Sequence, residues 1–260
     1  MDLELAGKTA LITGGSRGIG FAIAQCLARE GCNLHLASRS AEDLDAARTK
    51  LAPERAITVQ CHALDLGLSA NIAKLVDAVG DVDILINNAG AIPQGSLLAV
   101  DEEHWRQAWE LKVFGYINLT RAVYAKMKAR RKGVIVNIIG SAGERPTPNY
   151  IAGSTGNASL MAFSRALGGE SVDHGVRVVG LNPGSIETDR QRVRWQERAQ
   201  ARFGDPSRWP ELVTDAPMGR LGKPEEVADV AVFLASARAS YVSGTIVTVD
   251  AGKLSRNPAA

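Results

Sequence analysis

The 260-residue sequence is poor in cysteine and aromatic residues, and it has no long apolar run and no excess charge of either sign. The three cysteines, Cys26, Cys32 and Cys61, form no pair with metal-ligand spacing, so we expect buried, reduced thiols in a cytoplasmic protein. No apolar run approaches the roughly 18 residues of a membrane span. The first residues, MDLELAGKTALIT, are acidic and do not match a secretory signal. These absences argue against a disulfide scaffold and a membrane-spanning protein.

The charge balance also limits the class of partner. The 30 Lys and Arg residues nearly cancel the 28 Asp and Glu residues, which leaves a formal charge of +2. A charge this small favours neither nucleic acid nor a membrane surface as a partner. The 45% of apolar residues and the 22% of charged residues are ordinary for a soluble globular protein.

Short apolar runs alternate with helical patterns along the chain. The runs are rich in β-branched residues and apolar on both faces, as buried parallel strands are. We expect strands over residues 9–13, 33–37, 56–63, 82–87, 133–139, 177–182 and 245–250. Helices are expected over residues 21–30, 40–51, 69–79, 102–130, 150–172 and 224–236. This alternation predicts an α/β fold with a doubly wound parallel sheet, formed as a single domain over residues 1–260.

A glycine-rich turn, TGGSRGIG at residues 13–20, follows the first expected strand and opens the first helix. Gly14, Gly18 and Gly20 give the spacing G-x-x-x-G-x-G. Glycines at such a turn let the backbone approach a pyrophosphate, whose charge lies at the helix N-terminus. A glycine-rich turn without a ligand is the alternative.

Three further motifs follow in order: NNAG at residues 87–90, NPGSIET at 182–188 and SYVSGTIVTVDAG at 240–252. Together with the glycine-rich turn they resemble the short-chain dehydrogenase/reductase family over nearly the whole chain. The resemblance implies a Rossmann-type, seven-stranded parallel sheet with helices on both faces. It also implies a nicotinamide cofactor and a homotetramer.

The family's cofactor contacts transfer to this sequence position by position. They imply phosphate contacts in the glycine-rich turn, an adenine edge after the third strand, a ribose side at NNAG and a nicotinamide side at NPGSIET. The implied residues are Gly14, Ser16, Gly18, Ile19, Gly20, Asp65, Leu66, Asn88, Ala89, Gly90, Pro183, Gly184, Ile186 and Thr188.

The end of the second expected strand indicates the choice between NAD and NADP. An acidic residue there would bind the ribose 2′-hydroxyl and repel a 2′-phosphate. This chain instead has Ser38 followed by Arg39, and Arg17 lies in the glycine-rich turn. Two guanidinium groups favour NADP(H), because their fork matches phosphate oxygens. Two solvated surface arginines are the alternative.

The family's catalytic pattern is altered at all four positions. Family members usually have an Asn, a Ser, a Tyr and a Lys there, and the Tyr acts as the general acid/base. An ungapped alignment places Lys112, Gly140, Gly153 and Asn157 at these positions, in that order. A shift by one residue would place Ser141 at the Ser position, and a shift by three would place Tyr150 at the Tyr position. Neither shift restores the lysine.

Three side chains are candidates for a rebuilt catalytic site: Lys112, Tyr150 and Ser141. Lys112 is expected to project towards the cofactor and to supply a cation that stabilises a Tyr150 phenolate. Tyr150 precedes Gly153 by about one helical turn, so its ring is expected near the space that the glycine leaves open. A solvated lysine, a packing tyrosine and a serine that points away are the alternatives.

Two further sets of residues are considered for the cofactor and the substrate. The amide of Asn157 can both donate and accept a hydrogen bond, so it is expected to bind the nicotinamide ribose. Glu144 and Arg145 follow Ser141 on its loop, and they either contact substrate or are solvated.

A substrate lid is expected at about residues 189–217. Its first part, residues 189–204, carries five arginines against two acidic residues and is suited to an acidic substrate. Over residues 187–215, however, six arginines balance six acidic residues, which weakens that interpretation. Trp195 and Trp209 either line an apolar pocket or anchor the lid.

Three classes of function remain open at the level of sequence. The first is an NADP(H)-dependent oxidoreductase with a rebuilt acid/base site, which acts on a carbonyl or hydroxyl compound. The second is an NADP-binding protein without redox activity, such as a sensor or a partner subunit. The third is a non-redox isomerase or lyase. Because a fold does not fix function, the altered positions decide among them.

Overall fold

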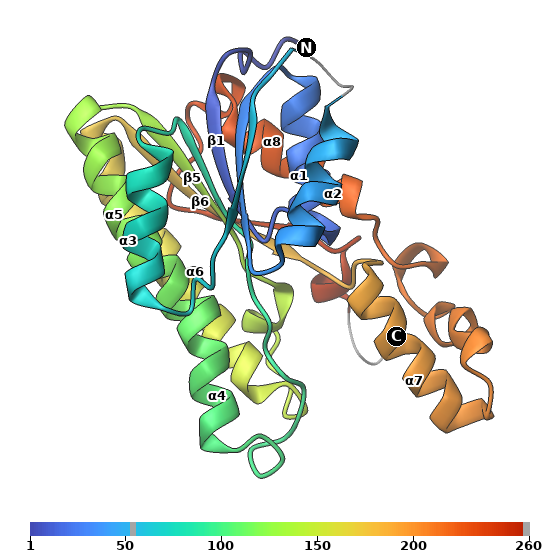
Figure 1. Cartoon of the computed structure of the whole chain (residues 1–260). Helices are drawn as coiled ribbons and strands as arrows, with labels where there is room; N and C mark the ends of the chain where they lie inside the picture. Colours follow the sequence, from blue (N-terminus) through green and yellow to red (C-terminus); the bar gives the residue numbers. More distant parts are fainter. Residues whose placement is uncertain (53–55, 257–260) are drawn as a thin grey trace.

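The computed structural model describes residues 1–52 and 56–256, in which seven parallel strands form one sheet (Figure 1). The strand order is β3-β2-β1-β4-β5-β6-β7. Their bounds are β1 Thr9–Thr13, β2 Asn33–Ser38, β3 Val59–Ala63, β4 Ile84–Asn87, β5 Gly133–Ile138, β6 Val176–Pro183 and β7 Ile246–Val249. The chain reverses direction across the sheet between β1 and β4, where open α/β folds bind ligands. The predicted Rossmann-type, seven-stranded sheet is therefore confirmed.

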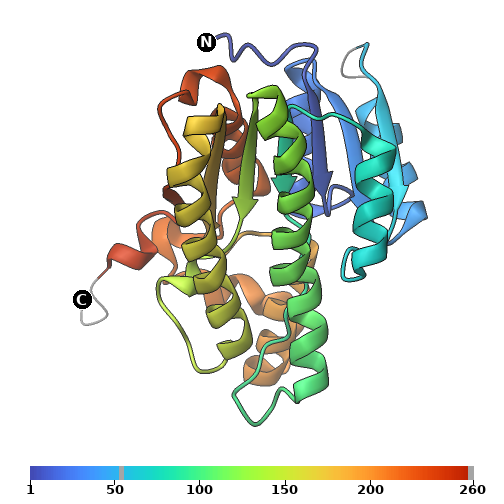
Figure 2. The same cartoon turned by 90° about the vertical axis from the view of Figure 1, so that its left-hand side faces the viewer.

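Helices cover both faces of the sheet. One face packs against α1 (Gly18–Arg29), α2 (Ala41–Leu51) and α8 (Pro224–Ala235). The other packs against α3 (Ser69–Val79), α5 (Gly115–Arg130) and α6 (Ile151–Glu170). Figure 2 shows α5 and α6 side by side along that second face.

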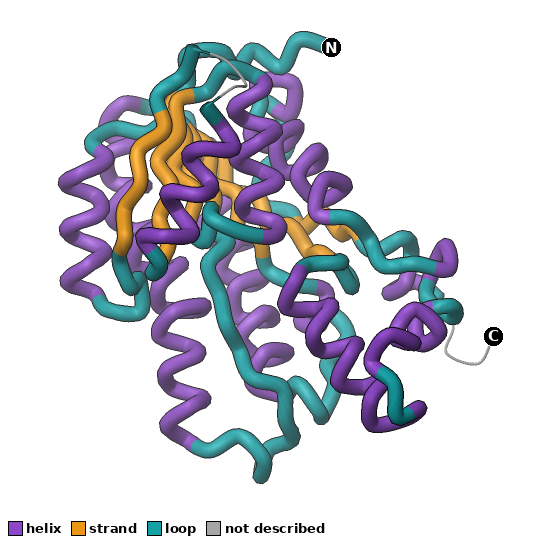
Figure 3. The backbone as a smooth tube through the Cα atoms, turned by 45° about the vertical axis from the view of Figure 1, so that its right-hand side comes forward, coloured by secondary structure: helices purple, strands orange, loops and turns teal. Residues whose placement is uncertain are grey.

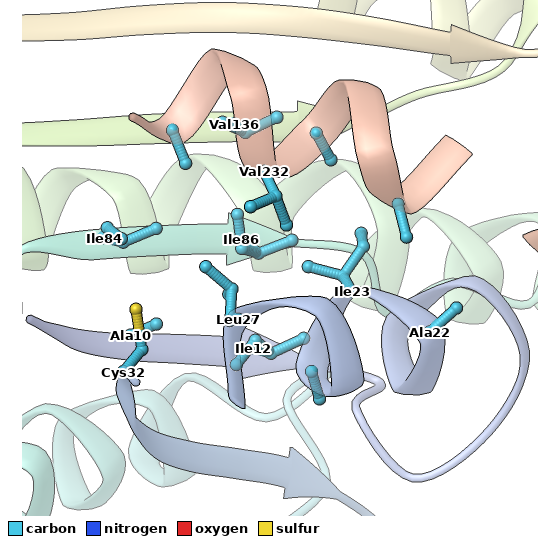
Figure 4. Packing of buried hydrophobic residues seen from close by; sticks show 14 of the residues in the cluster. Ala10, Ile12, Ala22, Ile23, Leu27, Cys32, Ile84, Ile86, Val136 and Val232 are labelled. Atoms are coloured by element: carbon cyan, nitrogen blue, oxygen red, sulfur yellow. The ribbon is translucent and has the colours of Figure 1, made fainter. Parts of the chain in front are cut away.

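The larger core cluster lies between β1, β4 and β5 of the sheet and helices α1 and α8. Ile12 of β1 pairs in register with Leu36 of β2 and Ile86 of β4, and all three side chains are buried. Figure 4 shows Ile23 and Leu27 of α1 packed beside these strands. Each fully buried aliphatic side chain of this size contributes roughly 1.5–3 kcal/mol to folding. The sheet is thus a firm support for the loops at its carboxyl edge.

Two helical segments extend beyond the carboxyl edge of the sheet (Figures 1 and 3). The first is α4 (Glu102–Trp109), which begins after Asp101, whose carboxylate accepts a hydrogen bond of 2.8 Å from the backbone N–H of His104. The second is α7 (Asp189–Phe203), which is followed by a 3₁₀ segment, Pro206–Val213. The expected lid therefore contains a helix of 15 residues.

Some sequence predictions need correction. The expected helix over residues 102–130 is interrupted by a π-helical turn, Glu110–Phe114, between α4 and α5. The third strand begins at Val59 rather than at residue 56. Among the three free thiols only Cys32 is buried, whereas Cys26 and Cys61 are partly exposed. In the described parts of the chain, no helix combines the length and the apolar character that crossing a membrane requires.

Candidate active site

The glycine-rich turn has the close backbone packing that its sequence predicts. It joins the end of β1 at Thr13 to the start of α1 at Gly18. A Cβ atom at Gly20 would collide with the carbonyl oxygen of Gly14. Only glycine therefore allows this close approach, which leaves the N-terminus of α1 open towards a phosphate.

The NNAG segment holds the glycine-rich turn in place through hydrogen bonds. The side-chain amide of Asn88 donates to the carbonyl oxygens of Thr13 and Gly14, at 3.1 and 3.2 Å. The hydroxyl of Thr13 accepts from the backbone N–H groups of Asn88 and Ala89, at 2.9 and 3.0 Å. Asn88 thus fixes the shape of the glycine-rich turn. Thr13 shares this role, and the sequence analysis did not name it as a site residue. A buried threonine at the last position of a strand, directly before the glycines, was the available signal.

The NPGSIET segment closes the turn from the opposite side. Pro183 ends β6, and the N–H of Gly184 donates to the carbonyl oxygen of Val249. Ile186 is buried. Thr188 caps α7, and its methyl group would lie 3.2 Å from a Cβ at Gly18. The N-termini of α1 and α7 therefore lie close to one another.

The region at the end of β2 has an uneven distribution of charge. The hydroxyl of Ser16 donates to that of Ser38 at 3.1 Å, which ties the glycine-rich turn to β2. Arg17 lies 3.4 Å from a carboxylate oxygen of Asp43 on α2. Arg39 is exposed and, among the residues described, has no carboxylate within ion-pair distance. Of the two arginines expected to bind the 2′-phosphate, Arg39 is therefore the one without a competing acid.

A cavity of about 680 Å³ opens beside this region. Its polar lining includes Asp65, Arg39, Arg190 and Arg194. The carboxylate of Asp65 accepts a hydrogen bond from the N–H of Gly67 at 2.9 Å, while Leu66 is buried. The expected adenine edge and the expected lid thus face the same space.

Asn157 and Gly140 form a matched pair. Gly140 has a φ of +138°, and a Cβ there would stand 2.8 Å from the side-chain nitrogen of Asn157. A serine at position 140 would therefore be strained and would also collide with Asn157. The amide of Asn157 is 3% exposed and has no hydrogen-bond partner among the described residues. A side-chain amide without a protein partner can bind a hydrogen-bonding ligand.

Tyr150 fills the space above Gly153. A Cβ at Gly153 would fall on the ring of Tyr150, in contact with its Cε1 and Cζ atoms. Tyr150 immediately precedes α6, and its ring packs against Ile92, Ala108 and Ala152. The phenol thus comes from the residue before the helix and lies over the helix position where the family has its tyrosine.

Burial and two nearby arginines act on Tyr150 in opposite directions. Burial raises the pKa of the phenol, while the charges of Arg194 and Arg190 lower it, and the net change is upward. The phenol therefore stays protonated at neutral pH. The sequence reasoning expected Lys112 to be the cation beside Tyr150, but the charges that act on it come from α7.

Lys112 lies in the π-helical turn and is only 8% exposed. Its amine donates to the carbonyl oxygen of Ile138 at 2.7 Å and to the hydroxyl of Tyr116 at 2.9 Å. Burial, with a smaller effect of Arg190, lowers the pKa of Lys112 to about 7. The lysine therefore binds the end of β5, directly before Gly140, and it exchanges protons near neutral pH. π-Helical turns are frequent at functional sites, but no sequence pattern here predicted this one.

Ser141 and its neighbours lie at the rim of the site. Ser141 starts a 3₁₀ turn, Ser141–Gly143, and its hydroxyl has no hydrogen-bond partner within the described chain. Glu144 lies 4.0 Å from Arg165 of α6 and so faces away from the lid. Arg145 lines a second cavity of about 450 Å³ beneath the lid, together with Trp195.

The comparisons with known proteins agree with this arrangement. The family model described as short chain dehydrogenase matches residues 8–199. Over 256 residues the chain is 32% identical to the 3-oxoacyl-[acyl-carrier-protein] reductase FabG of Chlamydia muridarum, which covers 97% of this chain and 99% of the relative. It is 35% identical to dehydrogenase/reductase SDR family member 4 of Bos taurus, with coverage of 96% and 88%.

Among solved structures, the L-sorbose reductase of Gluconobacter frateurii in complex with NADPH and L-sorbose superposes with a TM-score of 0.93. It is 33% identical, and the match covers 99% of this chain and all of the other. This chain belongs to the short chain dehydrogenase family. The named relatives are oxidoreductases, and one of the similar structures binds NADPH.

Proposed function

We propose that this protein is an NADP(H)-dependent oxidoreductase that interconverts a carbonyl and a hydroxyl group on a small molecule through a rebuilt acid/base site. The observation that supports the proposal is the ring of Tyr150 packed over Gly153, the helix position at which the family usually has its tyrosine, with a phenol whose pKa burial raises. General acid–base help of this kind is worth about 10²–10⁴-fold in rate.

The residues of the cofactor region fit a dinucleotide. The glycine-rich turn excludes side chains where a pyrophosphate would lie, and Asn157 offers an unpartnered amide towards the nicotinamide ribose. Arg39 supplies a guanidinium for a 2′-phosphate. The bound cofactor supplies the hydride, and the protein supplies orientation and the proton.

The roles within the site follow from position and protonation. Tyr150 would donate its proton to the carbonyl oxygen when the bound cofactor supplies a hydride to the carbonyl carbon. The phenolate that this leaves would take up a proton from solvent, so that the carbonyl compound, NADPH and one H⁺ give the alcohol and NADP⁺. Ser141 is proposed to hold the carbonyl oxygen. Lys112 is a positioning residue, because its amine holds the end of β5, from which Gly140 and Ser141 extend.

The test is NADPH oxidation across a panel of ketones, aldehydes and quinones. We expect Tyr150→Phe and Lys112→Ala each to lower kcat by at least about tenfold, with NADPH affinity nearly kept. The pH dependence of kcat is also measured for Lys112→Ala. A shifted pH dependence would indicate positioning by a titrating amine, because a merely structural loss would lower kcat without shifting it. Tyr124→Phe and Lys128→Ala on α5 are the matched controls, since both lie outside the site.

The alternatives give different results. Full activity of both variants would show that the proton comes from elsewhere. Tight NADPH binding without turnover of any compound in the panel would favour a sensor, a partner subunit or a non-redox isomerase or lyase.

A further inference from the structure

The five arginines of α7 do not share one environment. Three of them have surface partners: Arg192 with Glu187 at 3.0 Å, Arg198 with Gln94 and the ring of Trp195, and Arg202 with the ring of Phe203. The remaining two, Arg190 and Arg194, both line the cavity of about 680 Å³. Their spacing of four residues places them on one face of the helix.

Neither of these two arginines is neutralised. Within the described chain, no carboxylate lies within ion-pair distance of either. Arg190 donates to the carbonyl oxygen of Gly90 at 2.9 Å, and Arg194 donates to the side-chain oxygen of Gln191 at 3.2 Å. Burial and the charge of Arg194 both lower the pKa of Arg190. Asp65 and Glu110 also line this cavity, but neither lies within ion-pair distance of the two arginines, so the pair favours an anionic ligand.

The pair also lies next to the proposed proton donor. Arg194 and Arg190 are the two charges that act on the phenol of Tyr150. The lining also has an apolar part, Ile92, Pro93 and Ala108, beside the polar side chains of His104 and Gln107. The same cavity therefore offers an anion site, an apolar surface and a nearby phenol.

The cofactor phosphates do not account for this pair. Arg39 at the end of β2 is placed for the 2′-phosphate, and the N-terminus of α1 for the pyrophosphate. Arg190 donates to the carbonyl oxygen of Gly90, on the expected adenosine-ribose side of the groove. The cavity that the pair lines contains Arg39 and Asp65 of the expected adenosine end, but also Ile92 and Ala108, on which the ring of Tyr150 packs, so it extends to the proposed reacting end.

We propose that Arg190 and Arg194 bind a carboxylate of the substrate, so that the enzyme acts on small carbonyl or hydroxyl compounds that carry an acid group. That the bound acid is a substrate rests on the proposed function. The anion site itself is tested by binding measurements, without turnover.

The experiment measures binding to the NADP⁺-saturated protein by calorimetry. Two matched pairs of probes are used, 4-acetylbenzoate with 4-acetylbenzamide and 4-oxopentanoate with 4-oxopentanamide. Within each pair the ketone is the same and only the charge differs. We expect at least one acid to bind at least about tenfold more tightly than its amide, because charge-assisted hydrogen bonds are stronger than neutral ones.

Variants locate that preference. Arg194→Gln and Arg190→Gln are expected to remove it while NADPH affinity, followed by fluorescence, stays within about twofold. Arg192→Gln, on the same helix but paired with Glu187, is the control and is expected to keep it. Absence of a charge preference in both probe pairs would overturn the proposal. An unchanged preference in the double variant Arg190→Gln/Arg194→Gln would also overturn it. The same holds if these variants lose NADPH affinity and keep the preference for the acid.

Turnover is then measured separately with the same four compounds. A charge preference in binding without NADPH consumption would leave the anion site standing and count against the oxidoreductase. NADPH consumption without a charge preference would support the oxidoreductase and overturn the anion site.

Discussion

Arg39 stands at the carboxyl end of β2, with its guanidinium exposed towards the groove and no carboxylate of the described residues within ion-pair distance. Replacing Arg39 by Ala is expected to weaken NADPH binding by about ten- to a hundredfold, since a charge-assisted phosphate contact is worth about 1.5–3 kcal/mol. NADH binding is expected to change little, because NADH lacks the 2′-phosphate. Fluorescence titration of both cofactors measures the difference.

Asp43 provides the control for this prediction. It lies 3.4 Å from Arg17, so Asp43→Asn frees the second guanidinium and is expected to leave NADPH binding unchanged or tighter. Equal losses for NADPH and NADH in Arg39→Ala, or tighter NADH binding by the parent protein, would contradict the preference for NADP(H).

Lys112 makes stability depend on pH. Its pKa is about 7 in the folded protein, well below the ordinary value of 10.5, so the unfolded chain binds the extra proton between these two values. Stability must therefore rise with pH across that window. Between pH 7 and 8.5 the gain from this one group is roughly 1–2 kcal/mol, while the thiols, which begin to ionise in the unfolded chain, act in the opposite direction. Urea unfolding at several pH values measures it.

Lys112→Met tests the origin of that slope. The variant keeps the volume and removes the titrating amine, so its stability is expected to be flatter between pH 7 and 8.5 and higher than that of the parent at pH 7. The bond from the hydroxyl of Tyr116 to Ile138 remains in place. An unchanged slope would show that Lys112 does not titrate in the folded protein.

At the scale of elements, the start of α6 is built around the absence of a side chain at Gly153. Because the ring of Tyr150 occupies that space, Gly153→Tyr is expected to overfill it and to cost about 1–3 kcal/mol, despite the low helix propensity of glycine. The double variant Gly153→Tyr/Tyr150→Ala is expected to recover most of that loss.

Thermal unfolding of the two single variants and the double variant measures this coupling. Additive effects would mean that Tyr150 does not occupy the space above Gly153 in solution. Recovery by Tyr150→Ala would support the view that position 150 supplies the phenol that position 153 lacks.

At the scale of the whole molecule, exposed apolar side chains gather in two places. Leu97 and Phe114 line a cavity of about 580 Å³ next to α4, Leu98 follows Leu97 in the chain, and the fully exposed Tyr241 precedes β7. Exposed apolar groups of this size are typical of association surfaces. We expect a homotetramer, with the α4–α6 face and the β7 side as its two interfaces.

Light scattering at micromolar concentration is expected to give about four chain masses. Phe114→Glu and Tyr241→Arg are each expected to reduce the assembly to dimers, since each charges one interface and spares the other. A monomeric parent protein would contradict this prediction.

The sequence by itself determined the fold and the framework of the cofactor groove. Apolar β-branched runs that alternate with helical patterns are typical of a parallel sheet covered by helices, and a glycine such as Gly20 is required where the backbone approaches itself. These are local constraints, so spacing and residue type suffice to predict them. Strand ends shifted by up to three residues, because pairing with neighbouring strands decides where a ladder stops.

Only the tertiary structure decided which charges face the groove. In sequence, the six arginines and six acidic residues of the 187–215 segment cancel, but in the structure Glu187 and Glu211 neutralise other arginines and leave Arg190 and Arg194 in the cavity. The same holds for Tyr150, whose place over Gly153 depends on how the loop enters α6. Charge and side-chain direction at a site depend on contacts between distant segments, which composition and spacing do not encode.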